Sequence, residues 1–304
     1  MLTSCGDGGL EKMNNKREKI YGFLAVLPAL VLFMIFTYIP LMMTLRYSVT
    51  DWNGYSKEYN FVGLQNFINV FKDSEVLQTF GNTLYFTIIS VALGLIIQLL
   101  LAIFLFEKLK GKNFLRAIIY IPCIISPVIV SLTWINFFQY AGVINEVLAN
   151  IGLGSLSMDW LGNPEIVKNV LIFINTWQWA GYGMIIFMTG LSSIPPDVYE
   201  AAQLDGATGF KKFRYVTFPL LMPSVTVNMF IAITGALRLF DLPFVMTSGG
   251  PINASKTISM TIYDNAFLYE RFGYSSAIGV IFFVIIATVT VLQLRMTRKR
   301  EVEY

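Results

Sequence analysis

Long apolar stretches alternate with short charged segments along most of this chain of 304 residues. Six of the stretches contain no Asp, Glu, Lys or Arg, and each of them is at least 23 residues long. Because an α-helix rises 1.5 Å per residue, about 20 residues cross a hydrocarbon layer roughly 30 Å thick. The pattern therefore predicts six transmembrane helices, at about residues 20–45, 79–106, 117–140, 169–192, 216–238 and 275–295.

The same pattern predicts how the chain is organised. No internal repeat of fixed period and no low-complexity linker interrupts it, so residues 20–296 are expected to form one all-α membrane bundle. Residues 1–19 are expected to be a disordered tail, and residues 297–304 a second tail.

Prolines occur inside several predicted helices, for example Pro28 and Pro40 in the first and Pro122 and Pro127 in the third. A proline frees a backbone carbonyl, which finds no water inside a bilayer. We therefore expect these helices to pack against other helices rather than to face lipid on all sides.

Composition favours this membrane bundle over a large soluble core. Hydrophobic residues make up 55% of the chain and charged residues 13%, whereas soluble domains carry about 25% charged residues. The charges are also unevenly placed. With six spans, the side that holds both termini has 15 basic and nine acidic residues, and the opposite side has seven basic and ten acidic residues. Since basic residues gather on the cytoplasmic side, both termini are predicted to be cytoplasmic.

Several classes of chemistry are excluded by composition. The chain has no histidine, which removes Ser/His/Asp and Cys/His triads and His-ligated zinc. Its two cysteines, Cys5 and Cys123, are too far apart in sequence to indicate a disulfide framework or a metal site. Residues 250–257 superficially resemble a phosphate loop, but Ser255 occupies a position that requires glycine. We expect no metal and no nucleotide to be bound by this chain.

The segment at 195–223 differs from the other connections. Pro195 and Pro196 are expected to end the preceding helix, and Asp197 to cap a short new one over residues 199–204. Gly206 allows a tight reversal. A second short amphipathic stretch then places Phe210, Phe213 and Val216 along one side. So small a helix cannot bury its own apolar side, so it is expected either to lie on the bilayer or to dock into a partner protein.

This segment resembles the EAA signature of the permease subunits of binding-protein-dependent ABC importers. The residues that carry the resemblance at full spacing are Glu200, Ala201, Ala202, Gly206 and Pro219, and those of its extended form are Asp205, Ala207, Phe213 and Pro223. Val216 and Phe218 depart conservatively from the commoner Ile and Leu.

The rest of the chain is similar to the carbohydrate branch of that family, the maltose and glycerol-phosphate type permeases. The stretches that support this are residues 62–67 (VGLQNF), 120–122 (YIP), Ser126-Pro127, Trp134 and 247–251 (TSGGP). The resemblance implies a six-helix permease that passes a sugar from an extracellular binding protein through a bacterial or archaeal cell membrane.

The resemblance also implies the partners. The EAA loop of the family forms a coupling helix that sits in a groove of a separate ATPase, with Glu200, Ala201, Ala202, Asp205, Gly206, Ala207, Phe210, Phe213 and Pro219 as the coupling residues here. A second homologous permease and two ATPase copies would complete the complex. ATP and Mg²⁺ would be bound by the ATPase, so this chain would need no cofactor and would catalyse nothing itself.

A sugar site needs aromatic rings beside amide or hydroxyl groups. Such groups concentrate in the fourth and fifth predicted spans, and the candidates for the substrate path are Trp177, Gln178, Trp179, Tyr182, Asn228, Thr234, Arg238 and Asp241. Interfacial anchoring and bridging between helices are the alternatives for the aromatic and polar members. Arg238 and Asp241 either contact substrate or form an ion pair, which we favour.

The last outer loop is too rich in glycine for a helix and is expected to form an ordered turn. Thr247, Gly249, Gly250 and Pro251 are candidates for docking the extracellular binding protein, and a purely structural turn is the alternative. Three other functions are alternatives to sugar import. An importer permease for a non-sugar solute remains compatible with the loop, while an ion-coupled secondary transporter would bury an ionisable residue and a membrane enzyme would need paired catalytic groups.

Overall fold

The computed structural model describes residues 21, 23–106 and 110–301. Within these ranges the regular secondary structure is helical, apart from one isolated antiparallel bridge between Thr50 and Phe61, and turns and irregular segments connect the helices. Six helical segments are long and apolar enough to cross a membrane, as the sequence predicts, and they cover Phe23–Tyr47, Ser74–Phe106, Pro127–Asn150, Val167–Ser193, Met222–Thr247 and Phe272–Arg298. The predicted N-terminal tail lies outside the described residues, while the last helix extends into the predicted C-terminal tail.

The elements after residue 33 follow in this order: η1 (Met34–Tyr38), α2 (Ile39–Tyr47), α3 (Gln65–Lys72), α4 (Ser74–Phe106), α5 (Lys112–Ile124), α6 (Pro127–Phe138), α7 (Val143–Asn150), η2 (Gly154–Leu156), α8 (Val167–Ser193), α9 (Pro196–Leu204), α10 (Gly209–Lys212), η3 (Phe213–Thr217), α11 (Phe218–Leu220), α12 (Met222–Leu237), α13 (Asp241–Thr247), α14 (Ile258–Tyr263), η4 (Asp264–Leu268) and α15 (Phe272–Arg298).

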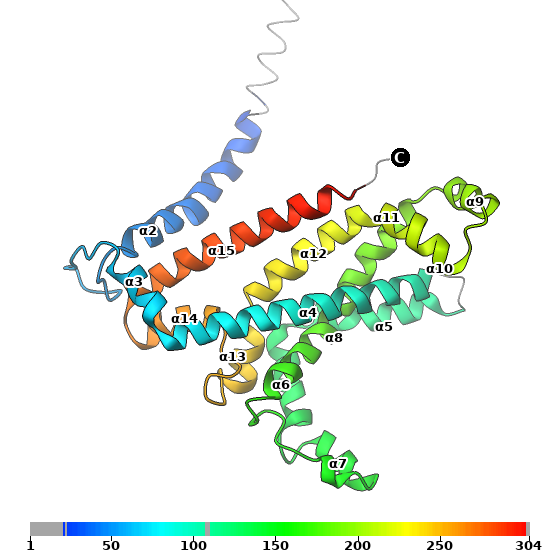
Figure 1. Cartoon of the computed structure of the whole chain (residues 1–304). Helices are drawn as coiled ribbons and strands as arrows, with labels where there is room; N and C mark the ends of the chain where they lie inside the picture. The colour runs from blue at the N-terminus through cyan, green and yellow to red at the C-terminus, as the bar shows by residue number, and fades with distance from the viewer. Residues whose placement is uncertain (1–20, 22, 107–109, 302–304) are drawn as a thin grey trace, which may run out of the picture.

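The bundle is built around α4 and α8, which pack along each other (Figure 1). Helix α12 packs against both and also contacts α15, and α5 packs against α8. Helices α9 and α10 project from one end of the bundle, and α7 projects away from the centre at the other (Figure 1). The two ends of the molecule are therefore formed by different connections.

Helix α4 shows the packing expected in lipid, with polar side chains inside and apolar ones outside. Thr79, Thr83 and Thr87 are buried, and the hydroxyls of Thr83 and Thr87 donate to the carbonyl four residues earlier. Leu84 and Ile88 on the same helix are exposed. Small and hydroxyl-bearing residues let membrane helices approach closely, while large aliphatic residues suit lipid contact. This arrangement supports the prediction of a membrane bundle.

Glycines on α8 set how closely its neighbours approach. A Cβ added at Gly181 would collide with the backbone of Ile119 and Tyr120 in α5. A Cβ at Gly183 would collide with the Gln98 side chain from α4. The sequence at these positions therefore fixes the spacing of the three helices.

The third predicted span is not one helix. Helix α5 ends at Ile124, and α6 begins at Pro127, because the residue before a proline is disfavoured in helical conformation. The freed carbonyl of Ile125 accepts a hydrogen bond of 3.2 Å from Nε2 of Gln178 in α8. Here a proline-interrupted segment packs against another helix, as expected.

The first helix behaves differently. It also contains prolines, yet its most apolar window is not buried at all within this chain, and α2 at its end packs against α15. The expectation that helices with prolines pack against others is therefore not met within this single chain for the first span.

Candidate functional site

The segment between α8 and α12 forms a projecting helix pair at one end of the bundle (Figure 1). Helix α8 ends at Ser193, and α9 starts at Pro196 after the extended residue Pro195. The predicted cap at Asp197 is wrong, because Pro195 is the cap position and Asp197 lies in the first turn. A proline needs no partner for its missing N–H at a helix start, and the Asp197 carboxylate still favours the positive end of the helix.

One side of this helix pair is anchored to the bundle. Ala202 is buried, and Val198 and Tyr199 pack against a core cluster that includes Leu191 and Leu221. The ammonium of Lys212 lies 5.5 Å from the centre of the Tyr199 ring. Together these contacts hold α9 at a defined position on the end of the bundle.

The other side faces solvent. Glu200, Ala201, Asp205 and Gly206 are exposed, and Gly206 adopts a φ of 78°, which glycine tolerates without strain. Leu204 and Phe210 are 90% and 77% exposed. Large apolar side chains next to the exposed carboxylate of Glu200 form a surface suited to a protein partner.

The remaining predicted coupling residues support this surface from below. The amide of Ala207 donates to the carbonyl of Ala202 at 2.8 Å. The half-buried ring of Phe213 lies between those of Phe210 and Phe218, at centroid distances of 6.3 and 5.9 Å. Pro219 lies in α11, where the chain turns into α12. The predicted set therefore divides into exposed residues and residues that position them.

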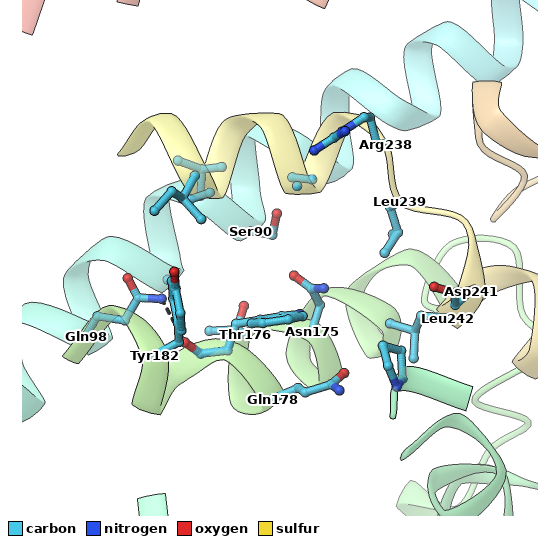
Figure 2. Close-up of a pocket in the computed structure, with 18 of the residues that line it drawn as sticks. Ser90, Gln98, Asn175, Thr176, Gln178, Tyr182, Arg238, Leu239, Asp241 and Leu242 are labelled. Carbon is cyan, nitrogen blue, oxygen red and sulfur yellow. Dashed lines mark hydrogen bonds between the residues drawn. The ribbon is translucent and has the colours of Figure 1, made fainter. Parts of the chain in front are cut away.

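A second candidate site is a cavity of about 230 Å³ between α4, α8, α12 and the start of α13 (Figure 2). Gln98 and Tyr182 lie at one end of it, and Arg238 and Asp241 at the other (Figure 2). Trp179 contributes an aromatic face, with its ring 6.1 Å from that of Tyr182 in an edge-to-face arrangement. The cavity thus combines rings, amides and charges.

Two buried amides connect the three helices beside this cavity. Nδ2 of Asn228 donates to Oε1 of Gln98 at 2.9 Å, and Nε2 of Gln98 donates to the carbonyl of Trp179 at 3.2 Å. Both side chains are buried, so these bonds are made in a low-dielectric setting where unpaired amides would be costly. Asn228, predicted in the substrate path, lines the cavity and also fixes α12 to α4.

The structure separates the predicted aromatic residues of α8. Trp179 and Tyr182 line the cavity, whereas Trp177 lines a different, apolar groove and packs edge-to-face with Trp134 at 5.2 Å. Thr234 does not line the cavity, and its hydroxyl donates to the carbonyl of Phe230. Gln178 lines the cavity, but its amide donates to the carbonyl of Ile125 at the break between α5 and α6.

The favoured ion pair between Arg238 and Asp241 is not formed. Nε of Arg238 donates to the carbonyl of Thr234, and both charged residues line the end of the cavity opposite Gln98 and Tyr182. Among the described residues, the ion pairs within 4.0 Å are those of Lys256. Arg238 caps the end of α12 while Asp241 begins α13, so the intervening turn separates their side chains (Figure 2).

Sequence reasoning missed the contribution of α4. Ser90 and Gln98 from α4 line the cavity, and the isolated glutamine in an otherwise apolar stretch was the available signal. Thr176 also lines it, and its buried hydroxyl has no hydrogen-bond partner among the described residues. An unpartnered hydroxyl beside a cavity can bond to a ligand hydroxyl or to water.

The candidate docking residues Gly249, Gly250 and Pro251 lie in the ordered turn that the sequence predicts, whereas Thr247 is the last residue of α13. The hydroxyls of Thr247 and Ser255 lie 2.7 Å apart, and Gly249 has a φ of 84°. Gly250 precedes Pro251 through a cis peptide bond. Gly249 is buried and Thr247, Gly250 and Pro251 are half-buried, whereas the neighbouring Ile252 is 85% exposed.

Lys256 holds this loop to the bundle. Its ammonium contacts Oε1 of Glu75 in α4 at 2.7 Å and Oδ2 of Asp264 in η4 at 2.6 Å, and only 5% of the residue is exposed. Burial alone would lower the pKa of Lys256, but the hydrogen bonds and charges of the two carboxylates outweigh it and raise the pKa above its ordinary value. Lys256, which stands at the lysine position of the phosphate-loop-like segment, is therefore a structural cation.

Comparison with known proteins adds to this geometry. Residues 90–302 match the family model described as binding-protein-dependent transport system inner membrane component. The chain is 33% identical to the multiple sugar-binding transport system permease protein MsmF of Streptococcus mutans, over 94% of this chain and 98% of the relative. It is also 33% identical to the trehalose/maltose transport system permease protein MalF of Thermococcus litoralis, over 97% and 99% of the two chains.

A solved structure resembles the whole fold. It is a bacterial ABC transporter involved in the import of the acidic polysaccharide alginate, with a TM-score of 0.82, 28% identity, and coverage of 95% of this chain and 98% of that one. A related structure of the alginate transporter contains a periplasmic protein bound to an alginate pentasaccharide. Given the family match over most of its length, the six spans and the projecting loop, the chain belongs to the family of binding-protein-dependent transport system inner membrane components and is a permease subunit of an ABC importer.

Proposed function

We propose that this permease passes a sugar or oligosaccharide from an extracellular binding protein through the cavity between α4, α8 and α12. The observation that carries the proposal is that this cavity places Trp179 and Tyr182 opposite the α12 wall and beside an unpartnered Thr176 hydroxyl. Aromatic faces contact the apolar face of a sugar ring, and hydroxyl and amide groups bond its hydroxyls. The sugar transport names of the relatives support the same substrate class.

The proposed energy source is a separate ATPase that binds the exposed side of α9 and α10. In this proposal Glu200 engages the ATPase, Ala201 allows close approach, and Leu204 and Phe210 supply apolar contact area. ATP and Mg²⁺ are held by that partner, so this chain hydrolyses nothing. Closure of two ATPase copies would rock the helices joined to α9 and open the cavity to alternate sides.

The proposed assembly includes a second, homologous permease, two ATPase copies and the binding protein. The uncovered first span within this chain and the exposed coupling surface support such partners. In this orientation α9 and both termini face the cytoplasm, in agreement with the distribution of basic residues. The loop that carries Pro251 and Ile252 then faces outward, where the binding protein docks.

Glu200→Lys tests the coupling. The variant should insert and fold normally, because Glu200 is exposed, but it should capture less ATPase on purification and abolish sugar uptake. Glu165→Lys, a matched change at an exposed glutamate on the other end of the bundle, is the control. Normal ATPase capture and uptake by Glu200→Lys would refute the assignment of this surface.

The substrate class is tested with a panel of labelled sugars and amino acids in proteoliposomes of the complete complex. Trp179→Ala should reduce uptake of the best sugar at least tenfold, and Thr176→Val should raise its KM, with ATPase capture unchanged in both. Trp177→Ala is the control, because Trp177 faces a different groove. Uptake of an amino acid but of no sugar would leave an importer of a non-sugar solute.

A further inference from the structure

A second, unassigned groove lies between α12 and α15, on the end of the bundle that carries α9. Its volume is about 690 Å³, and it opens along the surface of the bundle. One wall runs from η3 through α11 into α12, and the other is the last part of α15. It is separate from the cavity described above, because the two share no lining residue.

Both walls change from charged to apolar in the same direction. On α15, the lining residues Thr297, Gln293 and Val289 follow at intervals of four residues, so they lie on one helix face, and Arg300 follows in the turn just after the helix. At 1.5 Å per residue, Thr297 and Val289 are about 12 Å apart along the axis. The opposite wall repeats the order, from Arg214 through Phe218, Met222 and Val225 to Met229.

The two arginines form a cationic mouth. Both are exposed, and neither guanidinium forms an ion pair with a residue in the part of the chain that the structure describes. The Arg214 guanidinium lies 5.8 Å from the centre of the Tyr215 ring. Guanidinium groups bind phosphate through several parallel N–H donors, so two of them at one mouth suit a phosphate group.

Behind the mouth lies a buried acceptor without a partner. Gln293 is 6% exposed, and its Nε2 donates to the carbonyl of Thr226 at 3.3 Å and to Oγ1 of Thr297 at 3.2 Å. Its Oε1 is buried and has no hydrogen-bond partner among the described residues. A buried acceptor of this kind calls for a donor such as a hydroxyl group.

The deeper groove is apolar and contains flexible side chains. Met222, Met229 and Met296 line it together with Val225, Val289 and Leu292. Methionine adapts to irregular apolar ligands because it is unbranched and polarisable. A chain of methylene groups fits this part of the groove better than a rigid ligand does.

We propose that this groove binds one anionic phospholipid, of the phosphatidylglycerol type. The phosphate lies between Arg214 and Arg300, an acyl chain runs between the methionines, and a water molecule beside the glycerol esters donates to Oε1 of Gln293. The order of charge and hydrocarbon in the lipid matches the order along both walls. A helix of another membrane chain matches less well, since basic residues gather at the same membrane level in such chains.

Native mass spectrometry of the purified complete complex tests the proposal, with added phosphatidylglycerol or phosphatidylcholine of identical acyl chains. The wild type should retain phosphatidylglycerol in preference to phosphatidylcholine. Each basic residue near an anionic lipid contributes about a fivefold gain, so Arg214→Gln with Arg300→Gln should reduce retention by about 25-fold. Arg298→Gln with Lys299→Gln removes the same charge from residues that do not line the groove, and should have little effect.

A second variant blocks the groove while keeping both arginines. Met296 is exposed and lines the groove, so Met296→Trp should fill it and lower lipid retention without disturbing the core. Val291→Trp on another face of α15 is its control. Co-purification of the ATPase checks assembly for every variant, and lipid binding is read without transport, so failure here is distinct from failure of the proposed sugar permeation.

Two results would overturn the lipid site. Equal loss of phosphatidylglycerol from the two paired arginine and lysine variants would mean that only the general positive charge of this end attracts the lipid. In a cross-linking experiment, Met296→Cys is combined with single cysteines placed along the second permease. A disulfide between the two chains would mean that protein, not lipid, covers the groove.

Discussion

Two connections at opposite ends of the bundle treat their polar and apolar groups in opposite ways. The loop between α13 and α14, called the outer loop for the side on which we propose it to lie, buries its polar groups within the chain, where Lys256 joins two carboxylates and Asn82 donates to the carbonyls of Asn253 and Lys256. The segment that carries α9 and α10 leaves Leu204 and Phe210 in solvent. The polar groups of the first connection find partners within the single chain, whereas the apolar side chains of the second remain uncovered.

The difference indicates which connection gains binding free energy from a partner protein. A loop whose charges and carbonyls are satisfied internally keeps its shape whether or not another protein is present. An ordered turn with exposed large apolar residues gains free energy only when a partner covers it. Stability of the permease should therefore depend on the outer loop, and assembly should depend on α9 and α10.

The largest expected loss of stability comes from removing the ion pairs of the outer loop. Lys256→Met leaves Glu75 and Asp264 facing each other without a cation, which should destabilise the permease by about 3 kcal/mol, the lower end for a buried pair because Glu75 retains contact with water. Thermal unfolding of the purified protein measures the loss. Lys57→Met, at an exposed lysine, is the control. An unchanged Tm would mean that the loop is held by its other hydrogen bonds without the Lys256 ion pairs.

Changes in the α9–α10 segment should weaken assembly and leave the stability of the permease unchanged. Leu204→Ser combined with Phe210→Ser removes two exposed apolar groups, so the affinity for the ATPase should fall by roughly tenfold to thirtyfold while the Tm of the isolated permease stays the same. Binding of labelled ATPase measures this. Leu153→Ser, an exposed apolar change at the other end, should leave binding intact. A fall in Tm without loss of binding would contradict the comparison.

A smaller effect is expected from the hydrogen bonds of the outer loop. Nδ2 of Asn82 lies 2.7 Å from the carbonyl oxygen of Asn253 and 3.1 Å from that of Lys256. Asn82→Ala should cost about 1–2 kcal/mol, because two carbonyls lose their donor. Thermal unfolding beside Asn150→Ala, at an exposed asparagine, isolates the effect. Equal Tm values for the two variants would assign the loop's stability to Lys256.

The smallest effect concerns pH. Because the pKa of Lys256 is raised in the folded chain, its contribution is fully present below the ordinary lysine value of 10.5 and is lost as the pH rises through the higher folded value. The Tm difference between the wild type and Lys256→Met should therefore stay constant from about pH 6 to pH 9. It should narrow only in more alkaline solution. Narrowing near pH 8 would show that Lys256 is not held as the ion pair described.

The sequence predicts most of what depends on local pattern. Six spans follow from the absence of charge over long stretches, and the α9–α10 segment follows from prolines, Gly206 and the spacing of Glu200 to Pro219. Local pattern does not say which face of a helix meets which neighbour. For this reason the sequence groups Trp177 with Trp179, while the structure directs them to different grooves.

Residues close in sequence also misled the prediction of contacts. Arg238 and Asp241 are three apart, yet one ends α12 and the other begins α13, so they form no ion pair. The true partners of Lys256 are 181 residues before it and eight residues after it. No spacing in the chain indicates the first of these contacts.

The sequence by itself determined six membrane-spanning stretches and a segment bounded by proline and glycine between the fourth and the fifth, because hydrophobic length and turn chemistry are properties of consecutive residues. Tertiary structure alone decided which polar side chains share a cavity, which are spent on bridging helices, and which lysine is buried. Those outcomes depend on close approach of α4, α8 and α12 at Gly183 and on contacts between residues far apart in the chain. Packing is set by the shapes of several helices at once, so one helix read alone does not contain it.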